Sequence, residues 1–398
     1  MSLQSPTPKW PDGVSGGLVV FLLAAFTLAL FLAWRWFPVS IAVSPSSARS
    51  AKDVDAIAAR LTPPRGYTVN AYATGLGGAT VMVLTPKGDI IVSSPPHRVL
   101  LVKADNDGDG RSDGVETLID ELENPSGLFL DGDQLYIAED SRVLRVRFDA
   151  ETGKIVGTPE AILPDLPRNG MHWTRTIKKG PDGFFYVSIG ASCNVCIEKN
   201  PWRAGIIRFK PGEKAELYAS GLRNTVGFDW QPGTNVLYGV DNGRDWLGDN
   251  LPPEKVNQIK EGGFYGWPYL YGDNQPDPDF GKEAHDRTSH AIPPVYGLPA
   301  HVAPLSILFI RHSKMAKFGA AALVAEHGSW NRSQKIGYQV VALYWRDGQI
   351  TEEQFLTGFL KQDGDVLGRP VDIVESPDGT IFISDDYNGV IWRVAPSP

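Results

Sequence analysis

The sequence predicts an all-β protein: a six-bladed β-propeller preceded by one N-terminal transmembrane helix. Three observations support this prediction: a repeated turn-and-strand phrase, a high content of turn-forming residues, and one long uncharged apolar run near the N-terminus. The chain of 398 residues contains 42 glycines and 31 prolines. Their share is well above the average of roughly 12%, which favours many short strands joined by tight turns.

The apolar run GVSGGLVVFLLAAFTLALFLAW contains no charged residue and is long enough to cross the hydrocarbon layer of a membrane as a helix. Trp34, which ends this run, and Trp36 lie at the position expected for interfacial aromatic side chains. A cleaved signal peptide is the alternative, but the run is long for one and no clear A-x-A site follows it closely. The expected segments are a tail at 1–12, a transmembrane anchor at 13–36, a linker at 37–60 and the propeller at 61–398.

The repeat lies in the propeller segment. Each copy is a turn followed by an alternating strand, and the six copies are TPKGDIIVSS, LDGDQLYIAED, GPDGFFYVSIG, QPGTNVLYGVDNG, the degenerate FGAAALVAEHG, and SPDGTIFISDD. Most copies are followed by a second strand, such as HRVLLVKA. Copies at a spacing of roughly fifty residues predict six propeller blades. The spacing is stretched by one insertion around 250 to 300, and we expect the short helices that follow the anchor to be confined to this insertion.

In a propeller the innermost strands start near the central channel, so residues just before the repeated phrase should converge on its axis. For any single residue a plain surface-loop position is the alternative, but recurrence at matching repeat positions favours a site. The basic cluster suggests an anionic ligand with carboxylates or phosphate, while the net charge of -8 argues against a nucleic-acid partner. The candidate residues are His172, Arg175, Arg223, Asn224, His301 and Arg369.

The segments RNTVGF, DNGRD and GGFYGWP, with MHWTRTIKKGPDG, EHGSWNRSQK and GRPVD around them, resemble the pyrroloquinoline-quinone-dependent sugar dehydrogenases. This group contains soluble glucose, aldose and sorbosone dehydrogenases, and the resemblance covers roughly residues 60 to 395. It implies a quinoprotein that oxidises an aldose or sorbosone-like sugar with pyrroloquinoline quinone and calcium. Together with the anchor it implies a single-pass inner-membrane protein whose propeller lies in the periplasm and passes electrons to a respiratory acceptor.

The resemblance assigns the catalytic roles. His172 matches the general base that takes the proton of the sugar hydroxyl, a role suited to an imidazole because its ordinary pKa lies near working pH. Arg223 matches the arginine that stabilises negative charge on the reduced cofactor, and Asn224 matches the asparagine beside it.

The resemblance also implies the ligands of the cofactor and its calcium. The backbone carbonyls of Gly243 and Arg244 match a calcium-holding pair, and oxygen ligands suit that hard cation. Arg369 matches a ligand of a cofactor carboxylate, but a second arginine found in some members is replaced by Val371. The lysine expected near the fifth blade has no firm match, and the residues that could replace it are Asn331, Arg332 and Lys335.

Two further motifs carry expectations. Cys193 and Cys196 are the only cysteines; Ile197 after the second excludes covalent haem, and zinc would need further ligands. A loop disulfide is expected because the anchor implies export, with two free thiols as the alternative. The loop follows the His172 blade closely, so a bridge could shape the rim of the site.

The stretch DNDGDGRSDGVE has the ligand spacing of an EF-hand calcium loop. The expected ligands are Asp105, Asp107, Asp109, the carbonyl of Arg111, Asp113 and Glu116. No flanking helices are evident, so we expect a calcium-bound loop between blades and not a calcium sensor; an empty acidic turn is the alternative. A calcium-dependent lactonase or a non-catalytic sugar-binding propeller is the alternative function, because many six-bladed propellers hydrolyse esters or only bind.

Overall fold

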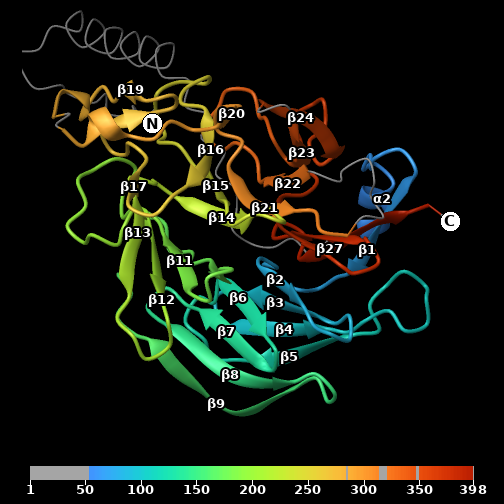
Figure 1. The fold of residues 1–398 in the computed structure, drawn as a ribbon. Helices are drawn as coiled ribbons and strands as arrows, with labels where there is room; N and C mark the ends of the chain where they lie inside the picture. The colour runs from blue at the N-terminus through green and yellow to red at the C-terminus, as the bar shows by residue number, and fades with distance from the viewer. Residues whose placement is uncertain (1–52, 284–285, 313–320, 347–348, 398) are drawn as a thin grey trace, which may run out of the picture.

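The computed structural model describes residues 53–283, 286–312, 321–346 and 349–397. Six β-sheets are arranged around a central channel (Figure 1). The strands nearest the channel are β2, β6, β10, β14, β21 and β25. The predicted six-bladed propeller is therefore confirmed. Each repeated phrase supplies the second strand of one blade, so the residues before each phrase do lead into the innermost strands.

The first three blades follow one another along the chain. Blade 1 consists of β2 (Met82–Leu84), β3 (Ile90–Ser94), β4 (Arg98–Val102) and β5 (Val115–Ile119). Blade 2 consists of β6 (Gly127–Asp131), β7 (Gln134–Ala138), β8 (Val143–Asp149) and β9 (Lys154–Leu163). Blade 3 consists of β10 (Ile177–Lys179), β11 (Phe185–Ile189), β12 (Gly205–Phe209) and β13 (Glu216–Ser220), with β17 (Gly263–Phe264) parallel to β13 at its edge.

The last three blades carry the insertion and the closure of the ring. Blade 4 consists of β14 (Thr225–Trp230), β15 (Leu237–Asp241), β16 (Glu254–Ile259) and β20 (Tyr296–Leu298). Blade 5 consists of β21 (Pro304–Phe309), β22 (Ala321–Glu326), β23 (Gln339–Arg346) and β24 (Gln349–Leu356). Blade 6 consists of β25 (Pro370–Glu375), β26 (Ile381–Asp385), β27 (Val390–Pro396) and β1 (Tyr67–Ala73).

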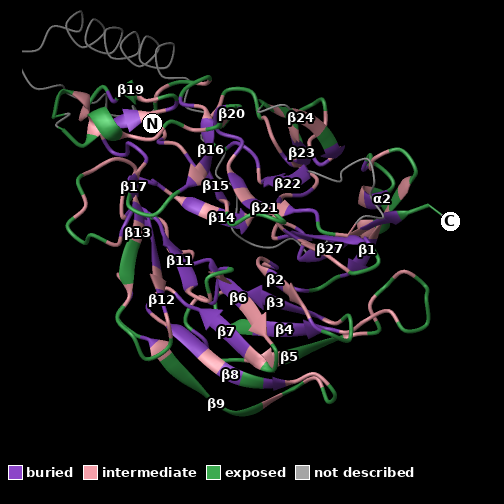
Figure 2. Ribbon diagram, viewed as in Figure 1, coloured by how far each residue is buried: buried purple, intermediate pink, exposed green. Residues whose placement is uncertain are grey.

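The blades form because their middle strands are apolar on both faces. In β3, Ile90 and Val92 pack toward blade 6, whereas Ile91 between them packs toward blade 2. Alternate side chains of a strand point to opposite faces, so one strand contributes to two interfaces. Six hydrophobic clusters fill the six interfaces between neighbouring blades. Figure 2 shows this difference in burial: the middle strands of the blades are buried, whereas the outer strand β9 is mostly exposed.

The outer strand of blade 6 comes from the start of the propeller segment. Strand β1 pairs antiparallel with β27, and Tyr67 lies opposite Pro396. The backbone N–H of Ser397 also donates to the carbonyl oxygen of Gly66 at 2.9 Å. The ring is thus closed by two strands from opposite ends of the described chain, a pairing that the repeat did not predict because β1 carries no copy of the turn phrase.

Within the described residues, short helices occur at two places. The insertion contains the hairpin β18 (Leu270–Tyr271) and β19 (Gln275–Pro276), and the 3-10 helices η1 (Gly281–Glu283) and η2 (Thr288–His290). Helix α2 (Val54–Ala58) precedes the propeller and is capped by Asp53, which accepts from the Ala56 N–H at 2.9 Å. The expectation that short helices are confined to the insertion is therefore wrong. Ala58 is buried in the cluster between blades 5 and 6, so this turn is held by packing.

The predicted transmembrane anchor, residues 13–36, lies outside the described residues, as does the tail before it. Among the residues that the structure does describe, no helix combines the length and the hydropathy needed to cross a membrane.

Candidate active site

A cavity of about 200 Å³ lies at the end of the channel where the innermost strands begin. The loops before β10, β14 and β21 and those after β15 and β22 surround it. The structure brings six of the predicted residues together there: His172, Arg223, Asn224, Gly243, His301 and Asn331.

A larger cavity of about 610 Å³ occupies the other end of the channel, around the later parts of the innermost strands. Its polar side chains already satisfy one another: Ser306 donates to Asp372 at 2.7 Å, and Lys178 lies 3.8 Å from Asp229. None of the predicted catalytic or cofactor residues lines it. The smaller cavity is therefore the candidate active site despite its size.

His172 is held as a neutral base. Its Nδ1 atom lies 2.7 Å from the carbonyl oxygen of Ala191, which can only accept, so Nδ1 carries the proton and Nε2 is the free acceptor. Burial and, next in size, the positive charge of Arg223 lower the pKa of His172 to about 4, with smaller contributions from Arg203 and Arg175, although the hydrogen bond to Ala191 opposes the shift. Both causes disfavour the imidazolium form.

Arg175, expected in the site cluster, supports the site from outside the cavity. Its buried guanidinium donates to Asp140 at 2.8 Å and to the carbonyl oxygen of Pro167 at 2.6 Å. A third bond, 3.1 Å long, goes to the backbone carbonyl of His172. Arg175 therefore fixes the backbone that carries the base and is not available to an anionic ligand.

Arg223 lines the cavity, and a set of hydrogen bonds holds its guanidinium in place. Its Nε and Nη2 atoms donate to the carbonyl oxygen and the Oδ1 atom of Asn194 at 2.9 and 3.0 Å. Nη2 also donates to Asp245 at 3.0 Å, and Nη1 donates to the carbonyl oxygen of Asn242 at 3.2 Å. These bonds use four of its five N–H groups, so the planar guanidinium has one orientation.

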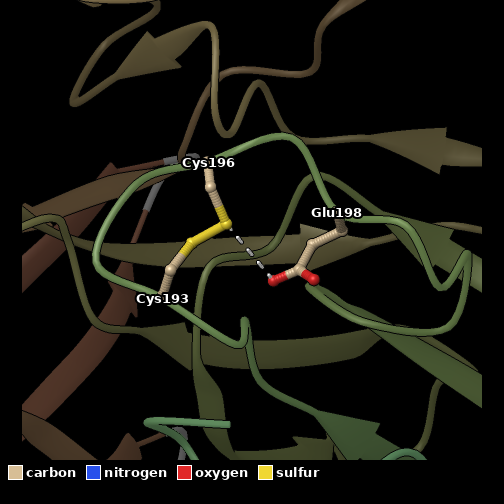
Figure 3. Close-up of side chains that lie close together, drawn as sticks. All are labelled: Cys193, Cys196 and Glu198. Carbon is tan, nitrogen blue, oxygen red and sulfur yellow. Dashed lines mark hydrogen bonds between the residues drawn. A yellow bond between two sulfur atoms is a disulfide. The ribbon is translucent and has the colours of Figure 1, made fainter.

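The predicted loop disulfide is present between Cys193 and Cys196. Glu198 lies beside it, with its Oε1 atom 3.9 Å from the Cys196 sulfur (Figure 3). Because both sulfurs are bonded to each other, no thiolate remains to bind a metal. Asn194 lies within this loop and bonds Asp245 in both directions, accepting from its N–H at 2.8 Å and donating to its carbonyl oxygen at 3.2 Å. The disulfide loop does not itself line the cavity, but through Asn194 it holds two residues that do, Arg223 and Asp245.

Asn224 and Gly243 are positioned by buried acids. Asp241 accepts from the Asn224 N–H at 2.8 Å and from the Thr225 hydroxyl at 3.0 Å. The Gly243 N–H donates to Glu254, the first residue of β16. Arg244 does not line the cavity; its guanidinium is bonded to Asp277 at 2.8 Å and to Asp279.

Two acids of the cavity were not predicted from the sequence. Burial raises the pKa of Glu254 to about 8, although the Gly243 N–H opposes the shift. Burial also raises the pKa of Asp245 against the effect of Arg223. Both carboxyls line the cavity. The sequence contains one signal for Glu254: this acidic residue directly follows two prolines and is the first residue of a buried strand.

Two further predicted arginines lie outside the cavity, besides Arg175 and Arg244. Arg369 donates to Asp386 at 3.3 Å, and His327 contacts the same carboxylate at 3.1 Å. Burial would raise the pKa of Asp386, but these two neighbours hold it at about 2. Arg332 bonds Asn250 at 3.0 Å. Of the candidates for the fifth-blade position, only Asn331 lines the cavity; Lys335 donates to the carbonyl oxygen of Gly364 at 3.0 Å.

The acidic stretch at 105–116 runs between β4 and β5 and into the start of β5, which confirms that it is flanked by strands and not by helices. Both strands belong to blade 1, so the expectation of a loop between blades is wrong. Carboxylate oxygens of Asp105, Asp107 and Asp109 lie within 4.8 Å of one another. Two other expected ligands have different partners: the Asp113 carboxylate accepts from Asn106 at 2.8 Å, and the Glu116 side chain pairs with Lys103. The side chain of Arg111, whose backbone carbonyl is the expected ligand, pairs with Asp55.

Two family models match the chain. The model described as glucose / sorbosone dehydrogenase matches residues 195–393, and the model described as TrAA12-like matches residues 61–276. An uncharacterized protein of Borreliella burgdorferi is 37% identical over 295 residues, covering 70% of this chain and 78% of that protein.

A pyrroloquinoline quinone-dependent pyranose dehydrogenase of Coprinopsis cinerea is 25% identical over 319 residues. The match covers 62% of this chain but spans only 43% of the length of that relative. The holo structure of the quinone domain of pyranose dehydrogenase from the same organism superposes with a TM-score of 0.70 at 20% identity. That superposition covers 84% of this chain and 96% of the domain, and it shows a shared fold.

Proposed function

The chain belongs to the glucose / sorbosone dehydrogenase family, and from this premise we propose that it oxidises an aldose or sorbosone-like sugar with pyrroloquinoline quinone. The observation that carries the proposal is the state of His172 in the cavity. Its tautomer is fixed by Ala191, its imidazole is kept neutral by burial and by Arg223, and its Nε2 atom is free to accept a proton. This is the state that a general base needs before substrate binds.

The residues of the cavity suit a divalent cation. Glu254 and Asp245 are carboxyls whose pKa burial raises, and a bound cation would favour their ionised forms. Carboxylate and backbone carbonyl oxygens are the ligands that calcium prefers. We assign calcium to these two carboxyls and the carbonyl of Gly243.

The same cavity suits an anionic quinone. Arg223 and Asn224 offer a positive charge and a side-chain amide, and the Oδ1 atom of Asn331 is buried without a hydrogen-bond partner among the described residues. We assign the cofactor contacts to these three side chains. When bound, pyrroloquinoline quinone supplies a carbonyl that accepts hydride.

The protein then handles the proton. His172 Nε2 removes the proton from the hydroxyl whose carbon is oxidised, and the imidazolium that results is close to Arg223. That charge repulsion makes the protonated form short-lived, so the proton passes on to solvent readily. Asp245, bonded to Arg223 at 3.0 Å, offsets part of the positive charge.

We further propose that residues 13–36 anchor the protein in the inner membrane, with the propeller in the periplasm. The uncharged apolar run supports a single-pass anchor. The Cys193–Cys196 disulfide supports an oxidising compartment, because disulfides are rare in the reducing cytosol. A membrane-bound respiratory acceptor would take the electrons.

The test is reconstitution of the purified full-length protein with pyrroloquinoline quinone and calcium, followed by dye reduction with a panel of aldoses and sorbosone. Sugar-dependent reduction that needs both additions, and that His172→Gln abolishes, is the expected result. Hydrolysis of a lactone without quinone, or sugar binding with no dye reduction by the reconstituted protein, would contradict the proposal and favour the lactonase or binding alternative.

A further inference from the structure

Two exposed tryptophans form a corner at the mouth of the candidate active site. Trp330 lines the cavity, and Trp246 lies beside it with the ring centroids 5.3 Å apart and the ring planes at 84°. Trp330 is 47% exposed and Trp246 is 50% exposed. Large aromatic side chains are usually buried in soluble proteins, so two adjacent exposed ones beside a polar cavity point to a binding surface.

The backbone of Trp246 is strained. Its φ angle is 73°, in the left-handed region that a bulky side chain rarely adopts. Such conformations cost free energy and persist only where surrounding contacts impose them, commonly at ligand-binding positions. The strained backbone thus carries an aromatic ring that is half exposed to solvent. Burial of this ring therefore contributes little to the stability of the fold.

Polar contacts on both sides of the corner hold the two loops together. On the cavity side, Asn331 donates to Asp245 at 3.1 Å. On the outer side, Arg332 donates to Asn250 at 3.0 Å and the N–H of Ser333 donates to Asp249 at 3.0 Å. The loops after β15 and β22 are thus joined on either side of the tryptophans, so the corner is formed before any ligand arrives.

The surroundings identify the ligand class. A protein partner needs a continuous interface of about 1,000 Å² in total, whereas charged and amide groups enclose this apolar corner on both sides. A pyranose ring has apolar C–H faces and a polar hydroxyl edge, which match an aromatic plane flanked by carboxylate, amide and guanidinium groups. We propose that Trp246 and Trp330 form a subsite for a second sugar ring, so that the substrate class includes reducing disaccharides and longer oligosaccharides.

This inference rests on the proposed sugar oxidation, with the reducing-end ring in the cavity and the next ring against the tryptophans. It can nevertheless be tested without turnover. Methyl glycosides lack the free anomeric hydroxyl, so calorimetry with the full-length protein can compare methyl β-glucoside with methyl β-cellobioside and methyl α-maltoside. We expect at least one of the disaccharide glycosides to bind about tenfold more tightly than the monosaccharide, on the scale of well-placed tryptophan contacts.

The variants Trp246→Ala and Trp330→Ala should remove this preference, while Trp246→Phe and Trp330→Phe should keep most of it because an aromatic face remains. Leu217→Ala, which shortens an exposed apolar side chain on β13, is the control and should bind as the wild type does. Equal affinity for mono- and disaccharide glycosides in the wild type, or a preference that survives both alanine changes, overturns the subsite. Loss of dye reduction with an intact disaccharide preference would instead contradict the dehydrogenase proposal alone.

Discussion

Arg223 is bonded to Asn194 twice, through the carbonyl oxygen at 2.9 Å and through the side-chain Oδ1 atom at 3.0 Å. Asn194 follows the first cysteine of the Cys193–Cys196 disulfide, so a covalent loop of blade 3 sets the orientation of a cation from blade 4. This relationship joins a structural bond to the proposed chemistry, because Arg223 also contributes to the low pKa of His172.

Asn194→Ala should impair the site more than the fold. It removes bonds to Arg223 and Asp245, and we expect kcat/KM of the reconstituted enzyme to fall by about ten- to a hundredfold, the scale of one or two charge-assisted hydrogen bonds. The melting temperature should be affected less than the activity, since Asn194 is only half-buried and belongs to none of the hydrophobic clusters between the blades. Asn200→Ala is the matched control, because Asn200 is in the same loop but caps the N–H of Trp202 at 2.9 Å. Equal activity of the two variants would contradict the positioning role.

Replacing the disulfide should act on the same contact. Cys193→Ser with Cys196→Ser frees the loop that carries Asn194, so kcat/KM should fall in the direction of the Asn194→Ala variant. A loop this short restricts the unfolded chain little, and we expect a loss of about 2 kcal/mol in unfolding free energy. Combining both changes with Asn194→Ala should add little further loss of activity. An additive loss would show that the disulfide acts elsewhere.

His172 should titrate far below an ordinary histidine. In the protein without cofactor, NMR of the imidazole should give a midpoint near the pKa of about 4, because burial and Arg223 both disfavour its charged form. Arg223→Gln should move the midpoint upward toward 6.5, whereas the exposed His290 supplies an internal control in both proteins. The base is active when unprotonated, so kcat/KM should fall as pH falls through the His172 pKa. An unchanged midpoint in Arg223→Gln would refute the charge coupling.

Glu254 should make the calcium-free protein less stable as pH rises. Its folded-state pKa of about 8 lies above the unfolded value of 4.5, so the unfolded chain ionises first between these limits. Stability that is present below pH 4.5 is therefore lost toward pH 8, at up to about 1.4 kcal/mol per pH unit. Glu254→Gln should remove this part of the slope in denaturant titrations, whereas the exposed control Glu213→Gln should keep it. Saturating calcium should flatten the wild-type slope, because a bound cation favours the ionised carboxyl.

The loop at 105–116 should respond to millimolar calcium. Three carboxylates already lie close together, so calcium should raise the melting temperature of the wild type and raise it less in Asp107→Ala with Asp109→Ala. The matched control is Asp363→Ala with Asp365→Ala, which removes two exposed carboxylates at the same spacing in another turn. An equal shift in the wild type and the Asp107, Asp109 variant would show that this loop binds no stabilising calcium.

The repeat was sufficient to predict the six blades, because its turn and alternating strand are local features. The pairing of β1 with β27 was not predictable in the same way, since it joins segments more than 300 residues apart and β1 has no turn phrase of its own. Similarly, His172, Arg223 and Asn224 were found because they occupy matching positions before the innermost strands, where propeller geometry decides their location.

The rest of the site depends on side-chain partners that sequence position does not specify. Arg369 has the expected position in the chain, yet its guanidinium is bonded to Asp386 and lies outside the cavity. Glu254 does not occupy one of the matching positions of the repeat. It lines the cavity because the fold buries it beside Gly243, whose N–H donates to its carboxyl group. Pairing and burial are properties of the folded chain, so they decided which of the candidate residues face the cavity.

The closure of blade 6 also imposes an order on synthesis. Strand β1 emerges from the ribosome before any blade exists, but its partner β27 is the last strand of the ring to be made. Until then β1 has an unpaired edge, and the apolar residues Ala71 and Tyr72 have nothing from blade 6 to pack against. The segment of β1 therefore stays without its partner strand until the end of the ring has been made, and this delay leaves apolar residues open to contact with other chains.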